Sequence, residues 1–251
     1  MQLALKLGPT RLRKLENLAQ SAQGKGWGAM TVTEEVAAVR ELLADRADQE
    51  LVVLDVGANV GAWTVQALQA FPQARIYCFE PGVTAFAELT QSLGTDPRVS
   101  LNRLALAETE GRALLYANTP GSVLASLTKR RLDHLGLDFS HEEPVQVQSL
   151  ESWAASAGVK AVDVLKLDVE GHELDVLRGA GQLLSCVRMI QFEFGGCNID
   201  TRTYLQDYWY LLSDDFELYR LGPAGAQLLP AYTEQDEVFT TTNFLAKRRL
   251  S

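Results

Sequence analysis

The stretch that decides the fold is Leu51-Val52-Val53-Leu54-Asp55-Val56-Gly57-Ala58-Asn59-Val60-Gly61. It opens as an almost wholly apolar run, which is typical of a parallel strand with helices on both faces of its sheet. A loop with glycines four residues apart follows, and the next residues read as a helix. Glycine lets a ligand approach the backbone closely, and free amides at a helix start face that ligand. The stretch therefore predicts a strand, a binding loop and a helix.

The spacing of this loop indicates which ligand it binds. Enzymes that bind dinucleotides normally carry G-x-G-x-x-G, which seats a pyrophosphate on the helix N-terminus. Here Asn59 stands at the second glycine position and Asp55 precedes the loop. A carboxylate and an amide suit the ammonium and carboxylate of a methionine moiety better than a pyrophosphate. We therefore expect Asp55, Gly57, Asn59 and Gly61 to bind a cofactor; a tight turn without a ligand is the alternative.

The end of the next predicted strand, Tyr77-Cys78-Phe79-Glu80-Pro81, carries an acidic residue. An acidic side chain at this place, one βα unit after a glycine loop, can accept hydrogen bonds from both hydroxyls of a ribose. Proline ends the strand and fixes the turn. We expect Glu80 and Pro81 to belong to the cofactor site, although a strand-terminal glutamate taken alone would be a helix cap.

Working outward, short apolar runs alternate with helical stretches, which predicts a doubly wound α/β fold with a mostly parallel sheet. The expected strands are residues 51–56, 75–79, 99–103, 163–167 and 189–194. The expected helices are residues 62–70, 84–93, 150–157, 172–184 and about 204–212. Two later runs, residues 216–221 and 243–247, are expected to close the sheet as a final antiparallel pair.

The segments outside this alternation define the expected domain organisation. Residues 1–50 predict an N-terminal helical segment, with helices over 10–23 and 33–43, before a catalytic domain over 51–251. A polar, irregular insertion is expected at about 111–148, near the strand ends where ligands bind in open α/β sheets. The basic stretch of the first helix is expected to be a solvated face, with a partner or membrane surface as the alternative.

Composition limits the classes of partner. The chain has 251 residues, 47% of them hydrophobic, and a net charge of -9, which argues against nucleic acid and favours a small acceptor. Three widely spaced cysteines, the lack of a signal-peptide pattern and the lack of a long apolar run predict a cytoplasmic protein without a transmembrane segment. The oligomeric state is left open.

A second cluster of polar residues follows the strand predicted at 163–167: Lys166-Leu167-Asp168-Val169-Glu170-Gly171-His172-Glu173. Charges gathered in one turn are costly to bury unless they have a function. His172 is the leading candidate for a general base, because imidazole titrates near neutral pH, with Asp168 and Glu170 as competitors. Helix capping without a catalytic role is the alternative for these residues. A divalent ion held by carboxylates is another alternative, but we expect none.

Two further glutamates are assigned to the acceptor. Glu173 follows in the same turn, with a helix cap as its alternative. Glu193 ends the strand predicted at 189–194, with a structural ion pair to an arginine such as Arg202 as its alternative. Trp63, next to the glycine loop, is expected to pack in the core rather than stack on a cofactor ring.

The sequence resembles the FkbM family of methyltransferases. The resemblance covers about residues 53–194, and its most specific part is the string from Lys166 to Glu173. Its other segments are 55–61, 79–81, 102–106, 110–111 and 177–180. The resemblance implies the Rossmann-like class I methyltransferase fold, S-adenosylmethionine as cofactor and O-methylation of a sugar or secondary metabolite.

The same resemblance implies that Asn102, Ala105 and Asp168 contact the cofactor. It does not identify the acceptor, and N- and C-methylation stay open. The alternatives from other classes are an NAD-dependent oxidoreductase, which should carry the missing G-x-G-x-x-G pattern, and a non-catalytic cofactor-binding module of the same fold.

Overall fold

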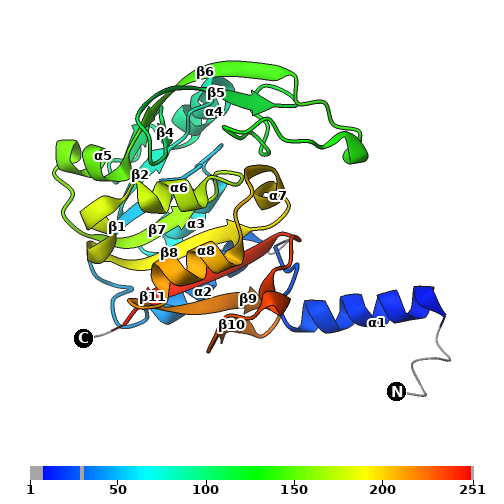
Figure 1. Ribbon diagram of the computed structural model, residues 1–251. Coiled ribbons are helices and arrows are strands. Elements are labelled where there is room, and N and C mark those ends of the chain that lie inside the picture. The colour runs from blue at the N-terminus through cyan, green and yellow to red at the C-terminus, as the bar shows by residue number, and fades with distance from the viewer. Residues whose placement is uncertain (1–7, 29–30, 250–251) are drawn as a thin grey trace.

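The opening apolar run forms strand β1 (Val52–Val56), an interior strand of the central sheet, labelled in Figure 1. The computed structural model describes residues 8–28 and 31–249. The α-helices are α1 (Pro9–Ala22), α2 (Val32–Leu42), α3 (Ala62–Ala70), α4 (Val83–Leu93), α5 (Leu150–Ala157), α6 (Glu173–Arg178), α7 (Cys197–Thr201) and α8 (Leu205–Leu212). The strands after β1 are β2 (Arg75–Phe79), β3 (Val99–Asn102), β4 (Ala105–Leu106), β5 (Gly111–Ala117), β6 (His141–Gln148), β7 (Val162–Leu167), β8 (Val187–Phe194), β9 (Phe216–Gly222), β10 (Gly225–Leu228) and β11 (Thr242–Arg248). Three short 3-10 helices are η2 (Asp133–Leu135), η3 (Gly181–Cys186) and η4 (Glu234–Asp236).

The central sheet has eight strands in the order β10-β9-β11-β8-β7-β1-β2-β3. The five strands from β8 to β3 are parallel, and β11 runs antiparallel to both β8 and β9. The predicted doubly wound sheet with a final antiparallel pair is confirmed. The chain places β11 between β8 and β9, and β10 extends the edge as a hairpin that was not predicted.

Helices cover both faces of this sheet, so its strands bury alternate residues in two separate cores. Val53 packs in the core with α2, α3 and α4, whereas its neighbour Leu54 packs in the core with α5, α6 and α8. In Figure 1, α6 and α8 lie in front of the sheet and α2 and α3 behind it. Burial on both faces explains why the strands read as continuous apolar runs rather than alternating ones.

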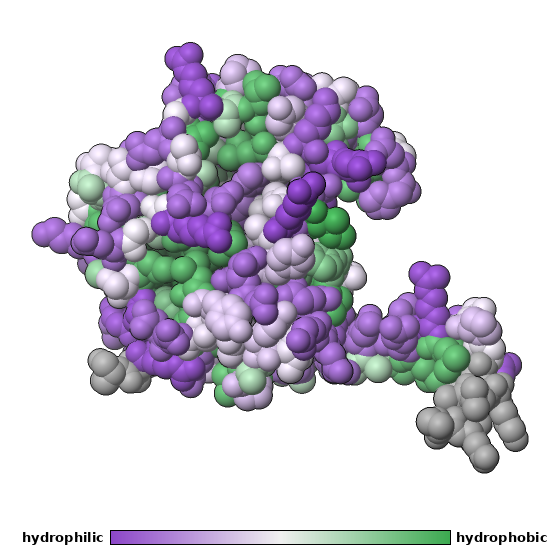
Figure 2. Space-filling model, viewed as in Figure 1, coloured by the Kyte–Doolittle hydropathy of each residue, from purple (hydrophilic) through white to green (hydrophobic). Residues whose placement is uncertain are grey.

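The predicted N-terminal segment contains two helices with different surroundings. Helix α1 has no buried residue and projects from the body, and Figure 2 shows apolar surface along it, to which Leu12, Leu15 and Leu18 contribute. Helix α2 instead shares a core with the sheet, where Val36 and Val39 are buried. Residues 1–7 and 29–30 of this segment, and 250–251 at the other end, lie outside the described residues. None of the described helices has the length and apolar character needed to cross a membrane.

The insertion is more regular than its sequence suggested. Its two ends form β5 and β6, which pair antiparallel and join β4 in a separate three-stranded sheet. The expectation of an irregular stretch was therefore wrong at both ends. The signal was the alternation in β6, where Val145 and Val147 are buried against a small core of their own.

The helix predicted over residues 172–184 is also broken. Helix α6 ends at Arg178, and a 3-10 turn, η3, follows. The chain at Gly179 passes so close to another segment that an added Cβ would lie 2.4 Å from the carbonyl oxygen of Ala107. Gly181 then adopts a positive φ of +50°, which ends α-helical geometry.

Candidate active site

A cavity of about 300 Å³ lies at the carboxyl ends of β1, β2 and β7, within the volume range of small-molecule sites. Eight of the residues selected from the sequence line it: Gly57, Asn59, Glu80, Pro81, Ala105, Asp168, Glu170 and His172. Five selected residues do not line it: Asp55, Gly61, Asn102, Glu173 and Glu193. The insertion contributes residues from Ser122 to Leu127 to the wall, as its predicted place near the strand ends requires.

Glu80 fastens the loop after β1 to the loop after β2. Its Oε2 accepts a hydrogen bond from the Asn59 amide at 3.0 Å, and its Oε1 accepts one from the Gly82 amide at 2.8 Å. The Gly57 amide meanwhile donates to the carbonyl of Phe79 at 2.9 Å. Burial raises the pKa of Glu80 to about 7, against the lowering effect of the two amides. Each carboxylate oxygen keeps a second lone pair, with which it can accept a hydrogen bond from a hydroxyl group.

Asp55 lies behind the loop rather than in the cavity. It has 0% exposure, its Oδ1 lies 2.9 Å from Lys166 Nζ, and its Oδ2 accepts from the Thr64 hydroxyl at 2.6 Å. Lys166 also donates to the Gly57 carbonyl at 3.0 Å. Burial alone would lower the pKa of Lys166, but Asp55 and Asp168 raise it above its usual range. Asp55 was expected to contact the cofactor; in the structure its charge instead holds Lys166 beneath the loop.

Two other residues assigned to the cofactor have structural surroundings instead. An added Cβ at Gly61 would lie 2.7 Å from side-chain carbons of Leu89 and Leu93, so this glycine lets α4 pack against the loop. Asn102 accepts a hydrogen bond from the Trp153 indole at 3.2 Å and donates to backbone carbonyls. Both residues shape the site from outside the cavity wall.

His172 is held at both ring nitrogens. Nδ1 lies 2.7 Å from Asp175 Oδ2, and Nε2 lies 3.0 Å from Thr128 Oγ1. A carboxylate only accepts hydrogen bonds, so Asp175 requires the proton on Nδ1, and Nε2 then accepts a hydrogen bond from the Thr128 hydroxyl. This tautomer is assigned from the hydrogen bonds. Thr128 therefore occupies the one lone pair of Nε2, the lone pair that a general base needs, and an acceptor hydroxyl would have to replace Thr128 there.

The insertion docks on the loop after β7 through three residues of one short segment. Ser126 donates to the Glu170 carbonyl at 2.8 Å, Thr128 contacts His172, and Arg130 binds the Glu170 carboxylate. Glu170 itself adopts a φ of +52°, which is uncommon for residues other than glycine. The insertion therefore fixes a strained turn at the cavity, and strain of this kind gathers at functional sites.

Glu173 is a structural residue. It has 0% exposure and accepts hydrogen bonds from the amides of Val169 at 2.9 Å and Gly171 at 3.1 Å. Burial raises its pKa to about 7. Glu173 was expected to bind the acceptor, with a helix cap as its alternative; in the structure its carboxylate closes the turn that presents Glu170 and His172.

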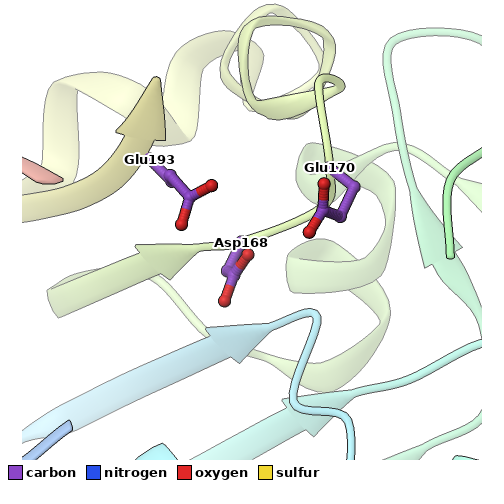
Figure 3. A group of neighbouring side chains, drawn as sticks. All are labelled: Asp168, Glu170 and Glu193. Atoms are coloured by element: carbon purple, nitrogen blue, oxygen red, sulfur yellow. The ribbon is translucent and has the colours of Figure 1, made fainter. Parts of the chain in front are cut away.

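Asp168, Glu170 and Glu193 form an acidic cluster at the ends of β7 and β8. Figure 3 shows Glu170 and Glu193 pointing into the space beside Asp168, and their nearest ligand atoms all lie within 4.8 Å of one another. Burial, followed by the charges of Asp168 and Glu170, raises the pKa of Glu193 to about 9. The sequence offered no spacing that joined Glu193 to this cluster, because the two strands meet only in the sheet. That no metal takes part stays a prediction.

The acidic cluster predicts a pH-dependent stability. The folded state keeps a proton on Glu193 that the unfolded chain loses above its ordinary pKa of 4.5, so this contribution to stability falls as pH rises toward about 9. Asp168, Glu170, Glu173 and Glu35 all raise this pKa. The free energy of unfolding of Glu193→Gln relative to wild type should therefore be at least about 1.4 kcal/mol larger at pH 8.5 than at pH 5.5. Urea unfolding of both proteins at both pH values measures this difference. An equal change in unfolding free energy with pH for the two proteins would refute it.

One charged residue of the cavity wall escaped sequence analysis. Glu35, on α2, lines the cavity although it precedes the glycine loop by more than twenty residues. In the sequence it reads as an acidic residue in the first turn of a helix, where negative charge is ordinary. Only the packing of α2 against the sheet brings it to the site.

Comparison with known proteins agrees with this geometry. The sequence model of the Methyltransferase FkbM domain matches residues 55–215, more than half of the chain. Over 189 residues the chain is 27% identical to 2-O-methyltransferase NoeI of Sinorhizobium fredii, covering 72% of this chain and 78% of that protein.

Two other curated relatives match over shorter stretches. Methyltransferase 1 of Beauveria bassiana is 31% identical over 142 residues, covering 51% of this chain and 57% of that protein. Hexuronic acid methyltransferase AglP of Haloferax volcanii is 28% identical over 158 residues, covering 62% of this chain and 60% of that protein. The chain thus spans less than two thirds of these two relatives. The family match includes the loop after β1, the insertion and the loop after β7, and it confirms the methyltransferase fold. The chain therefore belongs to the FkbM family of methyltransferases.

Proposed function

We propose that this methyltransferase uses S-adenosylmethionine to methylate a hydroxyl oxygen of a sugar or secondary metabolite. The observation that carries the proposal is the continuity of one cavity from Glu80 and Ala105, across the glycine loop, to His172. The names of the relatives NoeI and AglP, a 2-O-methyltransferase and a hexuronic acid methyltransferase, support a sugar hydroxyl as acceptor. The net charge of -9 supports a small-molecule acceptor rather than nucleic acid. A cytoplasmic location stays a prediction.

The residues of the cavity fit this cofactor. Glu80 has lone pairs for two ribose hydroxyls, and Leu104 to Leu106 offer an apolar wall beside it. Glu35, Glu80, Asp168 and Glu170 line the cavity, and Lys166 is the cation among its lining residues. When ionised, these carboxylates complement a ligand with a sulfonium and an ammonium group. When bound, the cofactor would supply a methyl group activated for transfer to a nucleophile.

The protein's own contribution is to hold the acceptor hydroxyl and to take its proton. Alignment of reacting groups in a water-poor cavity supplies much of such a rate increase. We assign His172 as general base: Nε2 accepts the hydroxyl proton, and Asp175 stabilises the imidazolium that forms. Asp168, with a side chain 44% exposed at the cavity, is placed to orient the acceptor. Glu170 is held by Arg130, and we assign it the role of positioning the turn that carries His172.

Binding of S-adenosylhomocysteine tests the proposed cofactor without knowledge of the acceptor. Wild-type protein should bind it with a Kd of about 1 µM, or roughly -8 kcal/mol. Glu80→Gln should weaken binding by about tenfold or more, because one oxygen is replaced by an amide that cannot accept a ribose hydroxyl. Isothermal titration calorimetry measures both values.

The matched control is Glu88→Gln, which removes the same charge from an exposed position on α4. This variant should bind like wild type. If wild type does not bind S-adenosylhomocysteine, or if both variants bind equally well, the assignment of this cavity to the cofactor fails.

A further inference from the structure

Glu35 is a cavity residue contributed from outside the matched family domain, since that match begins at residue 55. We propose that its carboxylate forms the subsite for the ammonium group of the cofactor's methionine moiety. The assignment rests on the proposed use of S-adenosylmethionine and goes further, because it names the group that recognises the amino-acid end of that cofactor. Three independent observations lead to it: how Glu35 is held, where it lies along the cavity, and which other carboxylates are already occupied.

The carboxylate of Glu35 is fixed from two sides by side-chain amides. Gln191 on β8 donates to Oε2 at 2.8 Å, and Asn243 on β11 donates to Oε1 at 3.2 Å. The Trp63 indole, which can only donate, occupies the Gln191 carbonyl oxygen at 3.2 Å. Gln191 must therefore turn its NH₂ group toward Glu35. Such a chain of fixed donors orients an acceptor in advance of binding, which lowers the cost of ordering the site.

The position of Glu35 along the cavity matches the amino-acid end. Glu80 follows β2, and Leu104 to Leu106 follow β3, so the adenosine end lies over these strands. The sheet continues from β1 to β7 and β8, where Gln191 holds Glu35. A ligand laid across the glycine loop from Glu80 therefore brings its other end toward Glu35.

The other carboxylates near this end are already committed. Asp55 is fully buried and paired with Lys166, and it does not line the cavity. Asp168 lies 3.6 Å from Lys166 and belongs to the acidic cluster with Glu170 and Glu193. Glu35 has only neutral amides as hydrogen-bond partners, so its charge is compensated by no direct ion pair among the described residues. Burial raises its pKa to about 7 despite the attraction of Lys166, and a bound ammonium group would favour the ionised form.

The experiment compares two ligands that differ only in this group. Calorimetry at pH 8 would measure S-adenosylhomocysteine and its analogue in which hydrogen replaces the α-amino group, each with wild type, Glu35→Gln and Glu41→Gln. Because a charge-assisted hydrogen bond is lost, Glu35→Gln should bind S-adenosylhomocysteine about tenfold or more weakly than wild type does. The same variant should bind the deaminated analogue as wild type does. Glu41→Gln removes an equal charge from an exposed position on the same helix and should change neither affinity.

The other results separate the two proposals. Equal weakening of both ligands in Glu35→Gln would show that Glu35 only shapes the pocket, and unchanged affinity for S-adenosylhomocysteine would show that it does not contact the ligand. Either outcome overturns the ammonium subsite while the cofactor proposal stands. If wild type binds neither ligand, the cofactor proposal and this subsite fall together. Retained binding of the deaminated analogue by Glu35→Gln is also the control that the variant is folded.

Discussion

Gly57→Ala is expected to reduce the affinity for S-adenosylhomocysteine by about two orders of magnitude and to lower the free energy of unfolding by about 3 kcal/mol. Gly57 has a φ of +77°, and an added Cβ would lie 1.8 Å from the carbonyl oxygen of Asp168. That neighbour is backbone, so it cannot rotate away like a flexible side chain. The loops after β1 and β7 would have to separate, and both line the cavity. Calorimetric titration and urea unfolding measure the two effects.

Gly158→Ala is the matched control for this substitution. Gly158 ends α5 with a φ of +71°, but an added Cβ there would meet no atom within 4 Å. This substitution should lower the free energy of unfolding by only about 1 kcal/mol, the cost of placing alanine in the left-handed conformation. Ligand binding should be unchanged. Equal behaviour of the two variants would show that the close approach of the loops at Gly57 is not what holds the site together.

His172→Ala is expected to lower kcat by about a hundredfold or more, the usual contribution of a general base. Affinity for S-adenosylhomocysteine should stay within about twofold of wild type, because the cofactor is assigned to other residues of the cavity. The assay is methyl transfer to a hexuronic acid or another sugar that the wild-type protein methylates, with kcat and Kd measured separately.

His134→Ala provides the comparison, because it makes the same change at an exposed histidine of the insertion. It should retain wild-type turnover. Unchanged kcat in His172→Ala would remove His172 from the mechanism and leave Asp168, the exposed carboxylate of the same loop, as the candidate base.

The sequence predicted the fold well because local signals and burial agreed. The apolar run at 51–56 and the runs that follow are buried on both faces of the sheet, and this environment demands apolar residues at nearly every position. Local signals failed where a distant backbone decided the outcome. The helix expected over 172–184 ends at Arg178, and the chain at Ala107 then passes too close to Gly179 for a side chain to fit.

The candidate site divides in the same way. By itself the sequence determined that a glycine loop, a strand-terminal Glu80 and the turn with His172 would lie at one edge of a parallel sheet, because carboxyl ends of parallel strands share an edge. Only the tertiary structure decided which charges face the cavity. Asp55 is turned inward to Lys166, and Glu35 is brought in from a helix far along the chain, since ion pairing and packing depend on distances in space that sequence spacing does not encode.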